Sequence, residues 1–153
     1  MNCVLVAVGG AKGSLACVTA CARLFADRAP PAVILLYVMQ YGGPAAADGV
    51  TIDAELAELH ETLEGSPQLE ALTAKAEATL AIPRMFLEEH GFRDLRAVIK
   101  TGRPVDEIIR AAEEYKAELI IIGNTRRLLD KLMLGDVTKQ VASAATVPVL
   151  LVR

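Results

Sequence analysis

Short apolar runs alternate with segments of helical spacing along the whole chain. Five of the runs are apolar on both faces and rich in β-branched residues, which is typical of the buried strands of a parallel sheet. These runs span residues 3–8, 32–38, 95–100, 118–123 and 147–152. The pattern therefore predicts five parallel strands with helices between them.

The intervening segments repeat apolar residues every three or four positions, as amphipathic helices do. The predicted helices span residues 14–26, 52–64, 67–90, 104–116 and 136–145. Pro104 suits the first position of its helix, and Gly91 suits the position just beyond the end of the third helix. Pro83 lies inside that third helix and predicts a kink or a break near residues 79–82, because proline lacks the backbone N–H that a helix needs.

Strands and helices alternate strictly, which favours an open, doubly wound α/β sheet with right-handed crossovers. We expect the strand order 3-2-1-4-5, with helices on both faces of the sheet. Ligands of such folds bind beyond the carboxyl ends of the strands, where the strand order reverses. This rule places Gly9-Gly10, Val38-Met39 and the loop after Gly123 at one edge of the sheet, which we call the rim.

The composition is that of one globular domain of 153 residues, with 53% hydrophobic and 23% charged residues. A net charge of −3 argues against a general binder of nucleic acids or anionic membranes. No apolar stretch approaches the length of a membrane span, and no signal peptide precedes the first strand, so we expect a cytoplasmic protein. Cys17 and Cys21 share the apolar stripe of one helix and are expected to pack as small apolar residues.

Several kinds of chemistry lack the residues that they require. Ser14 and Ser143 stand outside any G-x-S-x-G elbow, which argues against a hydrolase. The first turn, GGAKG at residues 9–13, has neither the acidic residues of a magnesium-binding receiver domain nor the spacing of a dinucleotide-binding loop. His60 is interpreted as part of a solvated helix face, and His90 as the end of a helix. We therefore expect no catalytic residue and no metal site; slow ATP hydrolysis would need a positioned base that the sequence does not offer.

Three segments resemble the universal stress protein family, and together they cover essentially the whole chain. VLVAVGGAKGS, residues 4–14, is similar to that family's first strand and turn. TGRPVDEIIRAAEEYKAELIIIGN, residues 101–124, resembles its G-x-P helix and the strand that follows. LGDVTKQVASAATVPVLLV, residues 134–152, is similar to its G-S-V-S helix and closing strand. The resemblance implies the same five-stranded fold.

The resemblance also implies a candidate nucleotide site at the rim. Nucleotide-binding members carry a glycine, two residues, a glycine, nine residues, and then a glycine with a serine or threonine. Glycines let the backbone approach phosphates, and the amides at the start of the next helix donate hydrogen bonds to them. The candidate residues of this site are Ala7, Val8, Gly9, Val38, Ile122, Gly123, Asn124, Arg126, Gly135, Asp136, Val137 and Thr138. ATP or AMP, with Mg²⁺, is the cofactor that these positions imply.

The chain departs from this pattern at four positions, although Gly123 matches the first glycine and Thr138 fits the later hydroxyl position. The departures are Arg126 in place of the second glycine, Gly135 one residue early, Asp136 in place of the hydroxyl residue, and Gly9 in place of the first-strand aspartate. A carboxylate at a helix N-terminus binds the free amides itself and competes with a phosphate. In the opposite interpretation, Arg126, Arg127 and Lys131 replace the lost backbone contacts with cationic side chains.

In this family the last strand commonly pairs with its copy in a two-fold dimer. Residues 147–153 form an apolar strand at an expected sheet edge, so we predict an isologous homodimer with antiparallel contact there. Two functions stay open. The four departures favour a protein that acts through dimer or partner interactions and has a degraded nucleotide-binding loop. The alternative is a weak ATP- or AMP-binding sensor that uses the rim.

Overall fold

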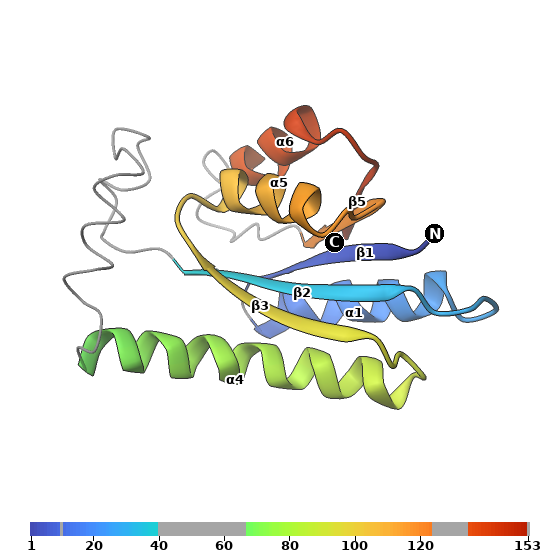
Figure 1. Cartoon of the computed structure of the whole chain (residues 1–153), viewed down its shortest axis with the longest axis horizontal. Coiled ribbons are helices and arrows are strands. Elements are labelled where there is room, and N and C mark those ends of the chain that lie inside the picture. The colour runs from blue at the N-terminus through green and yellow to red at the C-terminus, as the bar shows by residue number, and fades with distance from the viewer. Residues whose placement is uncertain (10, 40–66, 124–134, 153) are drawn as a thin grey trace.

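The computed structural model of the chain describes residues 1–9, 11–39, 67–123 and 135–152 (Figure 1). Five strands and four helices alternate in this part of the chain. In order they are β1 (Cys3–Val8), α1 (Ala11–Leu24), β2 (Ala32–Met39), α4 (Pro67–Glu89), β3 (Leu95–Thr101), α5 (Pro104–Glu114), β4 (Leu119–Gly123), α6 (Gly135–Ala144) and β5 (Val149–Val152). The helix predicted at residues 52–64 lies outside the described residues.

All five strands are parallel and form one sheet in the order β3-β2-β1-β4-β5, which confirms the predicted fold class and strand order. Helices α1 and α4 cover one face of the sheet, and α5 and α6 cover the other (Figure 1). β1 occupies the centre, and β3 and β5 form the two edges. The carboxyl ends of all five strands lie at the rim because every pairing is parallel.

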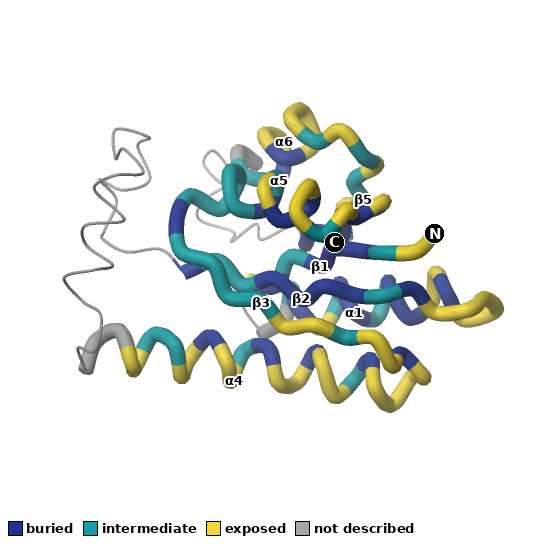
Figure 2. Tube along the Cα trace, viewed as in Figure 1, coloured by how far each residue is buried: buried dark blue, intermediate teal, exposed yellow. Residues whose placement is uncertain are grey.

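The core consists of two apolar layers, one on each face of the sheet. Successive strand residues point to opposite faces, so Val4 and Val6 pack toward α1 and α4 while Leu5 packs toward α5 and α6. Burial along β1, β2 and β4 is nearly continuous, as Figure 2 shows. Each fully buried Val, Leu or Ile side chain contributes about 1.5–3 kcal/mol of transfer free energy. The two-sided apolar pattern of the sequence is therefore explained by helices on both faces.

Of the kink or break predicted near residues 79–82 of the third helix, the structure contradicts the break. α4 runs from Pro67 to Glu89 as one helix, with Pro83 inside it. Pro83 is buried, and α4 packs along the sheet and α1, so tertiary contacts outweigh the loss of one intrahelical hydrogen bond. At the end of α4, the predicted role of Gly91 is confirmed by its φ of 89°. The backbone N–H of Phe92 then donates to the carbonyl of Leu87, which closes the helix end.

Candidate functional site at the carboxyl ends of the strands

The sheet brings the described candidates of the strands to one rim. Parallel pairing sets Ala7 opposite Ile122, and the same strands then end at Val8 and Gly123. Val8, Ile122 and Gly123 are buried, whereas Gly9 is exposed. The neighbouring Val38 of β2 is half-buried. The described strand ends therefore form an apolar surface next to an exposed glycine backbone.

Helix α6 supplies the remaining described candidates. It begins at Gly135, and its other end leads to the edge strand β5, which starts at the same end of the sheet as the chain's N-terminus (Figure 1). Val137 is half-buried and Thr138 is buried, and Val137 packs with the layer under α5. Asn124 and Arg126 lie outside the described residues, and Gly135 and Asp136 are described only as part of the α6 backbone.

Gly123 has a packing role that the sequence did not reveal. A β-carbon on Gly123 would lie 3.2 Å from the Cys17 sulfur and 3.4 Å from the carbonyl oxygen of Gly13. Both neighbours belong to α1, so the glycine lets this helix pack closely on the end of β4. Gly9 differs, because a β-carbon there would meet nothing within 4 Å. The rim thus has open space for a side chain at Gly9, whereas a side chain at Gly123 would crowd α1.

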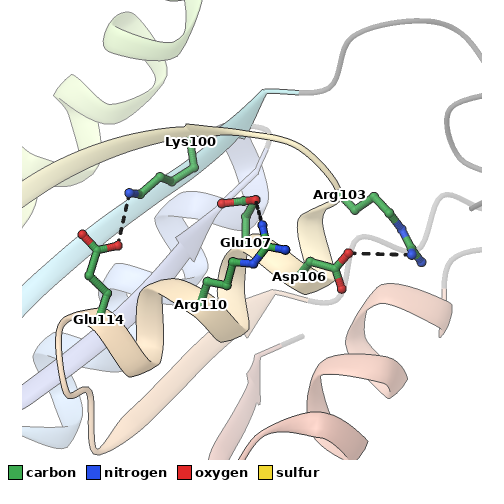
Figure 3. Close-up of polar contacts among 6 residues, drawn as sticks. All are labelled: Lys100, Arg103, Asp106, Glu107, Arg110 and Glu114. Atoms are coloured by element: carbon green, nitrogen blue, oxygen red, sulfur yellow. Dashed lines mark hydrogen bonds and ion pairs between the residues drawn. The ribbon is translucent and has the colours of Figure 1, made fainter. Parts of the chain in front are cut away.

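Sequence reasoning missed a second glycine arrangement at the end of β3. Gly102 has a φ of 149°, and its N–H donates to the carbonyl of Met39 at 3.1 Å. A β-carbon on Gly102 would lie 2.9 Å from Oε1 of Glu107. The Glu107 side chain is only 12% exposed and accepts a hydrogen bond from Nη1 of Arg110 at 3.0 Å (Figure 3). The sequence signal was the G-x-P step, because Pro104, two residues after this glycine, is the first residue of α5.

The remaining charged pairs of this region lie on its surface. Lys100 Nζ donates to Glu114 Oε2 at 3.2 Å, and Arg103 Nη1 lies 3.7 Å from Asp106 Oδ2 (Figure 3). Each of these side chains is at least a third exposed. Such pairs stabilise a fold by about 0–1 kcal/mol, so they matter here for the surface that they present.

The cysteines confirm their predicted role as packing residues. Cys17 and Cys21 are fully buried, and burial raises the pKa of Cys17 to about 11 and that of Cys21 to about 12. The pKa of Cys3 is also raised, mainly by burial and further by the nearby carboxylates. All three thiols are therefore protonated at neutral pH and are poor nucleophiles. Within the described residues, no group of three or more His, Cys, Asp or Glu side chains is placed to hold a metal ion.

The described helices also bear on the membrane question. None of them is long and apolar enough to span a bilayer.

A parallel α/β sheet with this strand order, whose first, second and fourth strands end at a common rim, is an open doubly wound α/β fold. The sequence model of the "Universal stress protein family" matches residues 1–153, so the chain belongs to that family. A universal stress protein of Methanothermobacter thermautotrophicus is 41% identical over 58 residues, which is 38% of this chain and 40% of the relative. The match thus spans less than half of that relative.

A second relative aligns over more of the chain. Universal stress protein MJ0577 of Methanocaldococcus jannaschii is 29% identical over 124 residues, which is 79% of this chain and 76% of the relative. The solved structure of MJ0577 superposes with a TM-score of 0.75 at 24% identity, covering 99% of this chain and 94% of that chain.

Two further solved structures contain nucleotides. One is a universal stress protein in complex with cAMP, with a TM-score of 0.66 at 21% identity, covering 99% of this chain and 96% of that chain. The other is the universal stress protein from Archaeoglobus fulgidus in complex with dAMP, with a TM-score of 0.54 at 21% identity, covering 100% and 98%. At these identities the likeness shows a shared fold.

Proposed function

We propose that this universal stress protein acts in the cytoplasm through self-association or partner binding along β5, with a nucleotide rim that is degraded. The proposal assigns it no catalytic step. The observation that carries it is the difference between the two edges of the sheet, one apolar and one charged.

The β5 edge is suited to pairing with another strand. β5 pairs only with β4 among the described strands, and its sequence VLLV contains no charged residue. Leu151 is 45% exposed there. An apolar edge strand with unpaired backbone groups favours strand addition from another chain. A second copy of β5 in antiparallel orientation would satisfy those groups symmetrically.

The β3 edge carries charges that discourage such pairing. The Arg96 guanidinium lies 5.6 Å from the centre of the Tyr115 ring, and Lys100 pairs with Glu114 at 3.2 Å. Both cations come from β3, and both partners come from the end of α5. Charged side chains on an edge strand are a common protection against edge-to-edge association. The contrast supports β5 as the edge that pairs.

Light scattering coupled to size exclusion tests this proposal. We expect a particle of twice the 16.3 kDa chain mass. Leu151→Lys should give a monomer, because a charge at an apolar edge opposes pairing. Leu24→Lys is the matched control, since Leu24 is 47% exposed at the end of α1, on another surface. A wild-type monomer at micromolar concentration, or equal effects of both variants, would contradict the proposal.

Adenine nucleotide binding at the rim is the second candidate function. Solved structures of the same fold with cAMP and dAMP favour it, as do the strand ends that converge beside the start of α6. The four sequence departures oppose it. If ATP with Mg²⁺ binds, ligand at 100 times its dissociation constant adds about 2.7 kcal/mol to the free energy of unfolding.

Thermal shift and calorimetry with ATP and Mg²⁺ separate the two functions. We expect little or no shift for the natural chain and tighter binding for the double variant Gly9→Asp with Asp136→Ser. The structure accepts the first change, because the space around Gly9 is open. Gly9→Asn with Asp136→Ser is the control, which keeps the shape but lacks the new carboxylate. Strong binding by the natural chain would refute the degraded rim, and equal binding by both variants would show that an aspartate at position 9 adds nothing.

A further inference from the structure

A cavity of about 270 Å³ lies at the opposite end of the sheet from the rim. Its walls come from the second half of α5, the start of β4 and the segment that joins α6 to β5, with Ile109, Ile120 and Val147 among the apolar residues. Glu113 and Lys116 line it as exposed charged residues. The cavity therefore has an apolar interior and a polar border.

Three alanines explain why the space is left open. Ala112, Ala117 and Ala145 line the cavity from three different segments, and each leaves room that a larger apolar residue would fill. The volume lies below the roughly 300–1,000 Å³ of typical small-molecule pockets. Its size and lining suit one or two apolar side chains better than a nucleotide.

Leu151 is an exposed apolar side chain on the same face of the sheet. Val149 packs into the layer under α5 and α6, whereas Leu150 and Val152 pack into the opposite layer. Because strand side chains alternate, Leu151 points to the face of Val149, and this is the face that holds the cavity. Leu151 lies near the carboxyl end of β5, and the cavity lies at the amino end.

Antiparallel pairing of two β5 strands brings these two features together. In an antiparallel pair, two residues that lie directly opposite each other point to the same face of the sheet. Side chains on one face are two positions apart along a strand, so the two-fold axis normal to the sheet passes beside one residue and not between two. With the axis beside Leu150, the partner subunit's Leu151 lies opposite Val149. Val147 is then its diagonal neighbour, within reach of a long side chain. The exposed leucine of one subunit therefore lies over the cavity of the other.

We propose that Leu151 of each subunit inserts into the cavity that α5, the start of β4 and the segment before β5 form in the other subunit. This inference rests on the proposed dimer and makes the contact reciprocal, with two copies per dimer. The occupant is a second copy of this chain, because the apolar edge continues from β5 into Val147 on the cavity wall.

Sedimentation velocity on the full chain tests the insertion through the dimer dissociation constant. Leu151→Ala should raise that constant about tenfold or more, since two leucines lose their pockets and each 1.4 kcal/mol is tenfold. Ala145→Phe should raise it similarly by filling the cavity. The double variant should dimerise more tightly than the product of the two single effects predicts, because the introduced aromatic ring occupies the space that the shortened side chain vacates.

The controls separate this inference from the proposed function. Ala142→Phe places the same bulk on an exposed position of α6 outside the cavity and should leave the dissociation constant unchanged. Ala145→Leu serves as a smaller plug if the phenylalanine variant fails to fold by circular dichroism. If the wild type is a dimer but the effects of Leu151→Ala and Ala145→Phe on the dissociation constant multiply in the double variant, the insertion is wrong and the dimer stands. The same holds if Ala145→Phe leaves the dissociation constant unchanged. A wild-type monomer would overturn both proposals.

Discussion

Gly123 shows how one residue can satisfy two explanations. The sequence pattern assigns it to close approach by a phosphate, and the structure shows that it already admits α1 against the end of β4. Close packing against α1 therefore favours glycine at this position whether or not a phosphate binds. Its presence says little about whether the rim binds a nucleotide.

Gly123→Ala should lower the free energy of unfolding by about 1–3 kcal/mol without any ligand, because the added methyl group overpacks the contact with Cys17 and Gly13. Urea unfolding measures the change. Gly9→Ala is the control and should stay within about 0.5 kcal/mol of wild type, since its surroundings are open. Equal losses in both variants would remove the packing explanation.

The two buried thiols predict a loss of stability at alkaline pH. The folded-state pKa values of Cys17 and Cys21, about 11 and about 12, lie above the ordinary value of 9.0. Above pH 9 the unfolded chain releases these protons while the folded chain keeps them, so ionisation favours unfolding. Each thiol then lowers the free energy of unfolding by up to about 1.4 kcal/mol per pH unit, until the pH reaches the folded-state pKa of that thiol.

Urea unfolding at pH 8, 9 and 10 checks this expectation. A Cys17→Ala, Cys21→Ala double variant is the comparison, because other titrating groups affect both proteins alike. The wild type should lose its advantage over the variant as the pH rises from 8 to 10. A difference that stays constant across this range would contradict the prediction.

At the scale of elements, α4 and α5 end in the same way with different residues. In each helix the residue after the cap has a positive φ, 89° for Gly91 and 53° for Lys116. In α5 the N–H of Ala117 donates to the carbonyl of Ala112 at 2.8 Å, as Phe92 does to Leu87 in α4. Glycine adopts this conformation readily, whereas other residues are strained in it.

Reciprocal substitutions at these helix ends should shift stability in opposite directions. Gly91→Ala should lower the free energy of unfolding by about 1 kcal/mol, because alanine is strained at this positive φ. The effect comes from backbone conformation alone, since nothing lies within 4 Å of the added β-carbon. Lys116→Gly should leave stability unchanged or raise it by up to about 1 kcal/mol. Thermal unfolding of both variants measures the difference. A loss in both would show that the lysine side chain contributes more than its backbone costs.

The elements also show where sequence patterns succeed. Apolar periodicity predicted all five strands and the four described helices, because helices on both faces demand two-sided apolar strands. Of the kink or break expected near residues 79–82, the break was wrong, because local propensity does not include the packing of α4 on the sheet and α1. The strand ends of the rim were placed correctly by topology alone. The crowding at Gly123 and the Gly102–Glu107 contact could not be predicted, because they depend on distances between elements.

At the scale of the whole molecule, the charged side chains on the β3 edge predict that the protein forms dimers and no larger assembly. Replacing Arg96 and Lys100 with threonine should expose a second edge for pairing. We expect these changes to produce concentration-dependent light scattering, and in an otherwise monomeric Leu151→Lys background they should produce new dimers. Arg84→Thr is the control, since it removes an exposed cation that is paired with Glu88 on helix α4 and not on a strand. Unchanged scattering would mean that charge does not protect this edge.

The cavity beside β5 belongs to this scale as well, because no local pattern marks it. Its three alanines come from distant positions and look unremarkable in the sequence. Only the meeting of α5, β4 and the segment before β5 creates the space. The apolar sequence of β5 was enough to predict the dimer edge, but no sequence pattern predicted the cavity beside it.

The central position of β1 also determines how the chain can fold. β1 can pair with β2 soon after both are synthesised, but its other neighbour, β4, comes much later in the chain. The backbone N–H of Asn2, just before β1, donates a hydrogen bond to Oε2 of Glu118, which is 116 positions away. The two halves of the sheet therefore meet only after a long loop has closed. Topologies dominated by such distant contacts fold slowly, and until closure one side of β1 stays uncovered. A nascent chain released before β4 emerges would expose an apolar strand, which is a surface that chaperones bind.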